Sequence, residues 1–181
     1  MGELNLILSL LLFVLVFLQS MAGVGILVIG TPLLLILNYE IIDIMSILLP
    51  ISIMTSFLNL IYFKINKKKF KMKIDKKIKY LFFLICLPSI FLGIYLLENF
   101  YNYINFKFLV SAVIFISFIL SKIKILITKL SDKIRIFILF LIGATHGLTN
   151  SGGALLSLFM ISFNEKNDSR YGITFFYFFL A

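Results

Sequence analysis

Long apolar runs separated by short charged connections dominate the chain. Residues 4–39 contain no charge, and further apolar stretches follow at 44–63, 80–97, 106–121 and 136–164. A bilayer core of about 30 Å needs about 20 helical residues, so most of these runs can span a membrane. The pattern predicts an all-α polytopic membrane protein.

Two of the runs are too long for one straight helix. At about 1.5 Å per residue, residues 4–39 would extend roughly 54 Å, well beyond the hydrocarbon thickness. Polar and small residues interrupt the first run at 19–25 and the second run, 136–164, at 145–153. We therefore expect each run to form two shorter helical pieces that meet at a non-helical tip or re-entrant hairpin.

The two breaks correspond at an offset of 127 residues, which aligns Gln19 with His146 and Gly25 with Gly152. Three predicted spans separate the two broken units, so the second unit enters the membrane from the opposite side. Inverted repeats with discontinuous helices are the sequence signature of secondary transporters. The first repeat then occupies residues 1–121. Residues 122–181 form a linker and an incomplete second repeat with a partial span at 171–181, so we expect a fragment or a truncated protein.

The net charge of +9 is concentrated in two lysine-rich connections, 64–79 and 122–135. The other connections are acidic or neutral, which is the positive-inside pattern, and we expect both lysine-rich connections to be cytoplasmic in a plasma-membrane protein. No aromatic or glycine-rich RNA motif interleaves with the lysines, so the predicted partner is the lipid bilayer and not nucleic acid. A polar break left poorly covered by an incomplete repeat also predicts either a homo-oligomer or a missing partner segment.

The breaks are the predicted site. Backbone amides freed at a break must meet protein or a wet cavity, and a half-helix N-terminus favours an anionic group. We expect Pro32 to serve gating, and Arg170 either to draw in the anion or to contact lipid headgroups. The residues predicted to bind the substrate are Gln19, Ser20, Gly23, Gly25, His146, Thr149, Asn150, Ser151, Gly152 and Gly153.

Individual residues at the breaks have alternative interpretations. His146 is the one histidine of the chain, and it either binds a proton or an anion or hydrogen-bonds a neighbouring helix. Gln19 either contacts substrate or bridges helices. Gly143 and Gly147 form a small-xxx-small motif, which predicts close helix packing. The single cysteine, Cys86, lies in an apolar run, and we expect no disulfide, metal or cofactor.

Both breaks resemble signatures of a known family. The stretch 19–25 followed by Thr31-Pro32-Leu33-Leu34, and the stretch 143–153 followed by Arg170, are similar to the two motifs of the TauE/SafE sulfite exporter, or 4-toluene sulfonate uptake permease, family. Val24 and Asn150-Ser151 depart from the usual glycine pattern. The resemblance implies a permease that moves small anions such as sulfite, organosulfonates or related sulfur oxyanions. We expect alternating access around the two breaks and no enzymatic activity.

Two other functions stay open on the sequence. A structural or assembly protein of the membrane would have the same composition without transport. An intramembrane serine hydrolase is suggested by Ser151 and His146 in one region, but the Gly-x-Ser-x-Gly spacing is not met.

Overall fold

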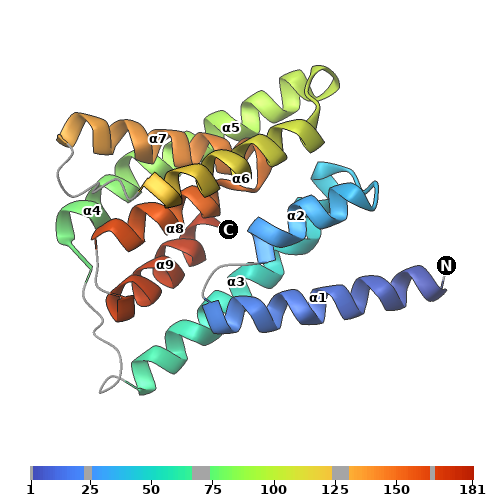
Figure 1. Cartoon of the computed structure of the whole chain (residues 1–181), viewed down its shortest axis with the longest axis horizontal. Coiled ribbons are helices and arrows are strands. Elements are labelled where there is room, and N and C mark those ends of the chain that lie inside the picture. The colour runs from blue at the N-terminus through green and yellow to red at the C-terminus, as the bar shows by residue number, and fades with distance from the viewer. Residues whose placement is uncertain (1, 23–25, 67–73, 124–130, 164–165) are drawn as a thin grey trace.

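The computed structural model of the 181-residue chain describes all residues except 1, 23–25, 67–73, 124–130 and 164–165. Its described residues form helices and a few turns, without a strand, which confirms the predicted all-α class (Figure 1). The elements are α1 (Gly2–Ala22), α2 (Ile26–Ile36), α3 (Ile41–Ile65), α4 (Lys76–Leu81), the π-helical turn η1 (Phe82–Cys86), α5 (Leu87–Phe100), the 3-10 turn η2 (Tyr101–Tyr103), α6 (Phe106–Ile123), α7 (Asp132–Thr149), α8 (Gly152–Phe163) and α9 (Lys166–Leu180).

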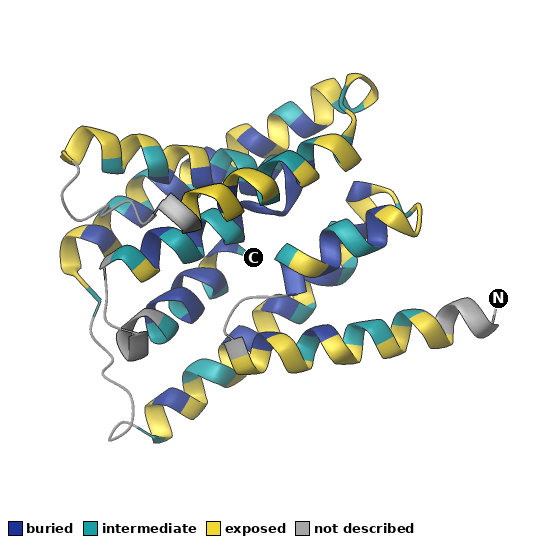
Figure 2. Cartoon of the chain, viewed as in Figure 1, coloured by how far each residue is buried: buried dark blue, intermediate teal, exposed yellow. Residues whose placement is uncertain are grey.

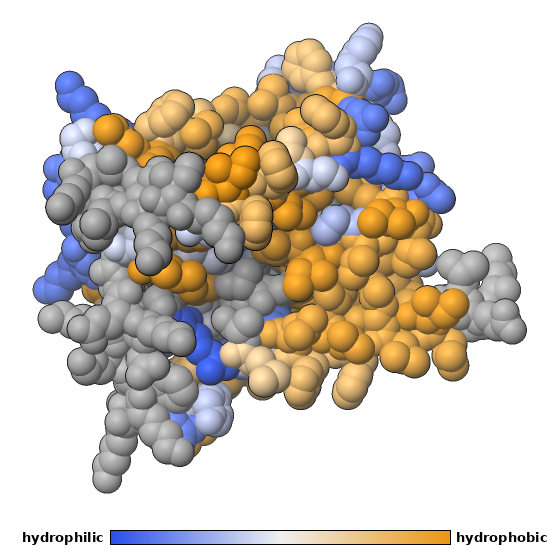
Figure 3. All heavy atoms as spheres, in the orientation of Figure 1, coloured by the Kyte–Doolittle hydropathy of each residue, from blue (hydrophilic) through white to orange (hydrophobic). Residues whose placement is uncertain are grey.

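Among the described residues, two helical stretches are long and apolar enough to cross a bilayer without a break. They are Ile41–Ile65 and the continuous Lys76–Tyr103, and they include the predicted spans 44–63 and 80–97. Apolar side chains predominate among the described residues in the middle of the face in Figure 3, and hydrophilic side chains lie mainly toward its ends. This distribution is that of a protein whose solvent is lipid around the middle and water at the ends.

The two overlong runs form two antiparallel helix pairs, α1 with α2 and α7 with α8. The α1–α2 pair begins and ends at one end of the molecule, and the α7–α8 pair begins and ends at the other (Figure 1). The last residues of α1 and α7, Ala22 and Thr149, are 127 positions apart, which is the predicted offset. The predicted opposed hairpins are therefore present. The division of the chain at residues 121 and 122 stays a prediction.

Polar contacts at the two ends agree with the predicted sidedness. Nζ of Lys77 lies 2.7 Å from Oδ2 of Asp132, so the two lysine-rich connections meet at one end. At the other end, Lys107 donates to Oδ1 of Asn38 over 2.7 Å, and the Tyr101 hydroxyl donates to Glu40. That the lysine-rich end faces the cytoplasm stays a prediction.

The first break is narrower than the sequence indicated. Gln19 and Ser20 were expected at a non-helical tip, but both lie in the last turns of α1, because the apolar helix continues to Ala22. Gly23 and Gly25 lie outside the described residues. Pro32 lies inside α2, which continues as one helix on both sides of it.

Glycine allows α5 and α7 to pack with their backbones in contact. A β-carbon placed on Gly143 would overlap the Ser89 hydroxyl and the Cys86 carbonyl, and one on Gly147 would overlap the Ile90 carbonyl. Gly93 of α5 is equally crowded by the backbone of α7. The predicted packing role of Gly143 and Gly147 is confirmed, and close approach holds the start of the second break rigidly.

Helix α9 covers the second break. The expectation that the break would be poorly covered is wrong, because Ile173, Phe176, Tyr177 and Leu180 of α9 are all buried. In Figure 2 the described part of α9 is largely coloured as buried. Phe176 stacks on Phe82 of η1 with ring centroids 4.4 Å apart. A single copy of the chain thus buries its own polar break, and the homo-oligomer stays an untested prediction.

Candidate anion-binding site

At the first break the side chain of Gln19 is fully buried and satisfied within the protein. Its Nε2 donates to the hydroxyl of Thr55 over 2.6 Å and lies 3.2 Å from the hydroxyl of Ser56. Its Oε1 accepts from the backbone N–H of Ile26, the first residue of α2, over 3.3 Å. Gln19 therefore links α1 to α3 and occupies one of the amides that open α2, which matches its alternative interpretation as a bridge between helices.

The partners of Gln19 on α3 were overlooked in the sequence. Ser52, Thr55, Ser56 and Asn59 stand at positions i, i+3, i+4 and i+7, so they lie on one face of an otherwise apolar helix. This i, i+3, i+4, i+7 spacing was the available signal. Asn59 lies on the same face, and its Nδ2 is buried without a hydrogen-bond partner.

At the second break two residues, Asn150 and Ser151, join α7 to α8. Asn150 adopts the left-handed conformation (φ 59°), which asparagine tolerates better than most side chains, and its N–H closes α7 on the His146 carbonyl over 2.8 Å. The Thr149 hydroxyl accepts from the N–H of Ser151, whose own hydroxyl donates to the Thr149 carbonyl. These bonds hold the turn and bring the N-terminus of α8 into the protein interior.

Gly152 and Gly153 are required where α8 begins. A β-carbon on Gly152 would lie 2.5 Å from the Ile142 carbonyl and 2.6 Å from Cβ of His146, and one on Gly153 would overlap the Tyr177 hydroxyl. The first turn of α8 therefore lies directly between His146 and Tyr177. Its leading N–H groups have no acceptor within the helix, and they carry the positive end of the helix dipole.

Three polar side chains around this turn are buried and have an atom without a hydrogen-bond partner. The atoms are Nδ1 of His146, Oδ1 of Asn150 and the hydroxyl of Tyr177. His146 is 2% exposed and the other two are fully buried. A buried polar atom without a partner costs about 1–3 kcal/mol. These three atoms lie around the N-terminus of α8, which makes this turn the candidate site.

Two polar contacts connect the second broken unit to the first. Nδ2 of Asn150 lies 3.2 Å from the Thr31 hydroxyl of α2. Nη2 of Arg170 donates to the carbonyl of Ser20 over 2.8 Å, and the guanidinium lies 5.7 Å from the ring centre of Phe63. Arg170 thus binds the C-terminal end of α1, where a cation also opposes the helix dipole.

The structure assembles only part of the predicted site. His146, Asn150, Gly152 and Gly153 lie together, and Thr149 and Ser151 shape the turn beside them. Gln19 is occupied by α3 and α2, and Ser20 is exposed with its hydroxyl bonded to Val16 of its own helix. Tyr177 was missed, because in the sequence it is one aromatic residue in an aromatic-rich stretch.

The geometry does not favour the serine hydrolase. The Ser151 hydroxyl donates to the Thr149 carbonyl, and Nδ1 of His146 has no hydrogen-bond partner. No hydrogen bond therefore joins the two side chains, whereas a nucleophile and its base must share one. Among the described residues, no three His, Cys, Asp or Glu side chains gather as a metal site would require.

Two opposed broken hairpins that place a helix N-terminus inside an apolar bundle define a polytopic membrane protein with the architecture of secondary transporters. The comparison with protein families agrees. The family described as Sulfite exporter TauE/SafE matches residues 8–174, and the chain belongs to this family of membrane transporters. No curated protein and no solved structure gives a significant match.

Proposed function

We propose that the protein is a secondary transporter that carries a small anion across the plasma membrane by alternating access. The substrates to test first are sulfite, organosulfonates and related sulfur oxyanions, because the family is described as one of sulfite exporters. The observation that carries the proposal is the second break, where an open helix N-terminus meets three buried side chains with unused hydrogen-bonding atoms.

The charge of the site supports an anion over a cation or a neutral solute. The N-terminus of α8 contributes roughly half a positive charge. None of the residues identified around it, His146, Asn150, Ser151 and Tyr177, is a carboxylate that would oppose an anion. In an apolar surrounding this partial charge is poorly screened, so it acts on a ligand more strongly than in water.

The contacts between the two units support alternating access. Only a few polar bonds cross between the described parts of the broken helices, among them Asn150 to Thr31 and Arg170 to Ser20. Such bonds can break and reform as one unit rocks against the other around the bound anion. Pro32 is next to Thr31 in α2, so a change in the contact between Thr31 and Asn150 could bend α2 at Pro32. This position supports the proposed part of Pro32 in gating.

Uptake of radiolabelled sulfite into proteoliposomes tests the proposal. We expect protein-dependent flux that saturates with sulfite and is reduced by other small anions, and that falls when His146 is replaced by alanine while the protein still inserts. The replacement Asn99→Ala is a matched control, since Asn99 is exposed and donates to a carbonyl of its own helix. Flat flux for every small anion tested, with correctly inserted protein, would contradict transport and leave a structural or assembly role.

A further inference from the structure

We propose that two turns at the end opposite the lysine-rich connections form a latch that, when closed, separates the second break from that end. The latch consists of Asn38 and Glu40 in the turn between α2 and α3, and of Tyr101 and Lys107 at the turn between α5 and α6. It regulates access to the proposed transport site, so it rests on that function. The latch is closed in the structure, and it has to open once in each transport cycle.

Two side-chain hydrogen bonds close the latch. The Tyr101 hydroxyl donates to Oε2 of Glu40 over 3.2 Å, and Nζ of Lys107 donates to Oδ1 of Asn38 over 2.7 Å. The partners are 61 and 69 positions apart in the chain, and both bonds are exposed. Exposed polar contacts contribute little to stability. These two bonds can therefore break and reform without unfolding either turn.

Each turn holds its own side of the latch in place. Asn38 has a positive φ of 64°, and the N–H of Tyr39 bonds the Leu34 carbonyl over 3.0 Å, which closes the end of α2. On the other side, the rings of Tyr101 and Phe106 lie with their centroids 5.4 Å apart, so the turn into α6 is packed as one unit. Because both turns are preformed, opening the latch moves them together with the helices to which they belong.

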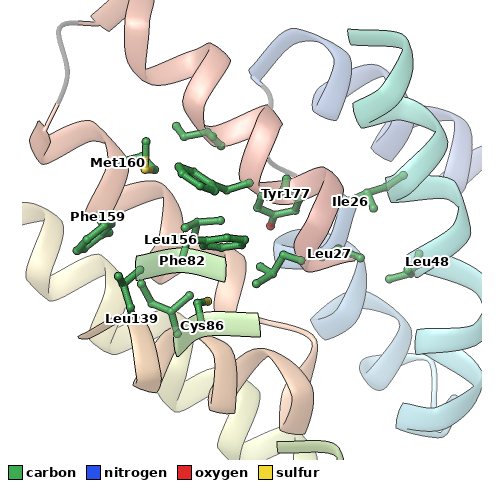
Figure 4. Close-up of a cluster of buried hydrophobic side chains, with 14 of the residues drawn as sticks. Ile26, Leu27, Leu48, Phe82, Cys86, Leu139, Leu156, Phe159, Met160 and Tyr177 are labelled. Atoms are coloured by element: carbon green, nitrogen blue, oxygen red, sulfur yellow. The ribbon is translucent and has the colours of Figure 1, made fainter. Parts of the chain in front are cut away.

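The latch joins helices that pack in different groups. Helices α5 and α7 are in backbone contact, which leaves them no room to slide. Cys86, Leu139 and Leu156 belong to the apolar cluster on this side of the molecule (Figure 4). Ile26 and Leu48 lie apart from them, on α2 and α3 (Figure 4). The latch therefore connects the group around α5 and α7 to the pair α2 and α3.

Helix α2 links the latch to the second break. Its Thr31 hydroxyl lies 3.2 Å from Nδ2 of Asn150, and Asn38 follows about two helical turns later. The buried Leu34 lies between these two positions of α2. Helix α2 packs on α6, whose buried Val110 belongs to the same apolar cluster as Leu34. While α2 and α6 stay together, these apolar side chains close the way from the latch to the second break.

A reversible cross-link across the latch tests the proposal in proteoliposomes. In Asn38→Cys/Lys107→Cys, a bifunctional thiol reagent should lower sulfite flux at least about ten-fold, because helices fixed at one end cannot rock, and reduction should restore the flux. Cys86 is fully buried, so it is protected from the reagent. The matched control is Asn99→Cys/Tyr103→Cys, a pair within the α5 end of the turn, whose cross-link should leave flux unchanged. Unchanged flux in the cross-linked latch would overturn the latch and leave transport standing.

A distance measurement tests the latch without relying on flux. Spin labels at Ile42→Cys and Phe108→Cys, exposed positions in the first turns of α3 and α6, leave all four latch residues in place. Pulsed electron paramagnetic resonance should give one short distance, and a second, longer one in the presence of sulfite. Adding Tyr101→Phe and Lys107→Met together should populate the longer distance without sulfite, because both bonds are lost.

Lys77→Met is the control for the distance measurement, since it removes the ion pair with Asp132 at the other end and should leave the distances unchanged. A single distance under every condition would overturn the latch. Absence of flux for every small anion from a protein whose latch opens would overturn the proposed function alone. Absence of both flux and the second distance would overturn the two together.

Discussion

The two broken hairpins occupy corresponding places in the chain but satisfy their polar groups differently. At the first, Gln19 fills the break from within, binding α3 and the leading amide of α2. At the second, His146 stands at the equivalent position, and its free Nδ1 is accompanied by unused atoms of Asn150 and Tyr177. The comparison teaches that a repeated break need not have a repeated function. One hairpin is closed by its own side chain, and at the other we propose that a ligand takes up the unused hydrogen-bonding atoms.

The largest predicted difference in folding stability between the two hairpins is at the first residue of the helix that follows each break. Ile26 begins α2 with a fully buried side chain, whereas Gly152 begins α8 against the Ile142 carbonyl and His146. We predict that Gly152→Ile loses more than about 3 kcal/mol of folding stability, because backbone and His146 would have to move to make room. The recovery of monodisperse protein in detergent measures this effect.

A small change at the corresponding residue after the first break, Ile26→Val, is the control. Ile26→Val removes one methyl group from a buried side chain and should cost only about 1 kcal/mol. If Gly152→Ile were recovered and melted like the unmodified protein, α8 would not begin in the crowded position described above.

Gln19 should matter for stability more than for flux. Gln19→Leu keeps a similar volume but leaves the Ile26 amide unpaired and removes the bond to Thr55. We expect a loss of about 2 kcal/mol, visible as a lower melting temperature. Flux per folded molecule should change little. Ser20→Ala, on the exposed side of the same helix turn, should alter neither quantity. A Gln19→Leu protein with normal melting but no flux would place substrate at the first break.

Asn150 should behave in the opposite way. Asn150→Gly keeps the positive φ that the turn needs, so we expect folding to be preserved. Loss of its contact to Thr31 should reduce flux about ten-fold, the effect of roughly one hydrogen bond. Asn38→Gly is a close control, because Asn38 also has a positive φ (64°) but lies at an end of the molecule. Equal flux in the two variants would contradict a role for Asn150 at the site.

The fold was largely predictable because lipid imposes strong rules. Runs of about 20 apolar residues must be helices, and a run of 36 residues such as 4–39 must turn back. Helix ends were less predictable. The polar residues Gln19 and Ser20 suggested an early break, but in lipid a helix satisfies its own backbone, so α1 continues to Ala22.

The site was predictable only where a backbone feature marks it. Gly152, Gly153 and Asn150 stand out because the turn needs their conformations or small size. Tyr177 does not, since its role depends on how α9 packs on α8, and no local pattern distinguishes it from the aromatic residues around it. Gln19 was instead predicted to bind substrate, but its side chain is used within the protein. Its residue type suggested a ligand, but the hydroxyl groups that occupy it lie more than 30 positions away on α3.

Replacing Arg170 should have the smallest effect on stability and flux. The variant distinguishes two roles for Arg170, a structural contact between the hairpins and attraction of the anion. Its guanidinium donates to the Ser20 carbonyl and lies over Phe63, so it joins α9 of the second unit to α1 and α3 of the first. Arg170→Gln should lower stability by about 0.5–1 kcal/mol, since the bond is partly exposed. Sulfite flux should fall at most slightly and by the same factor at low and high sulfite concentration. If Arg170 instead draws the anion in, flux should fall mainly at low sulfite and low ionic strength, where an attracting charge acts most strongly. The concentration dependence of flux at two salt levels therefore decides whether Arg170 stabilises the contact between α9 and α1 or attracts the anion to the second break.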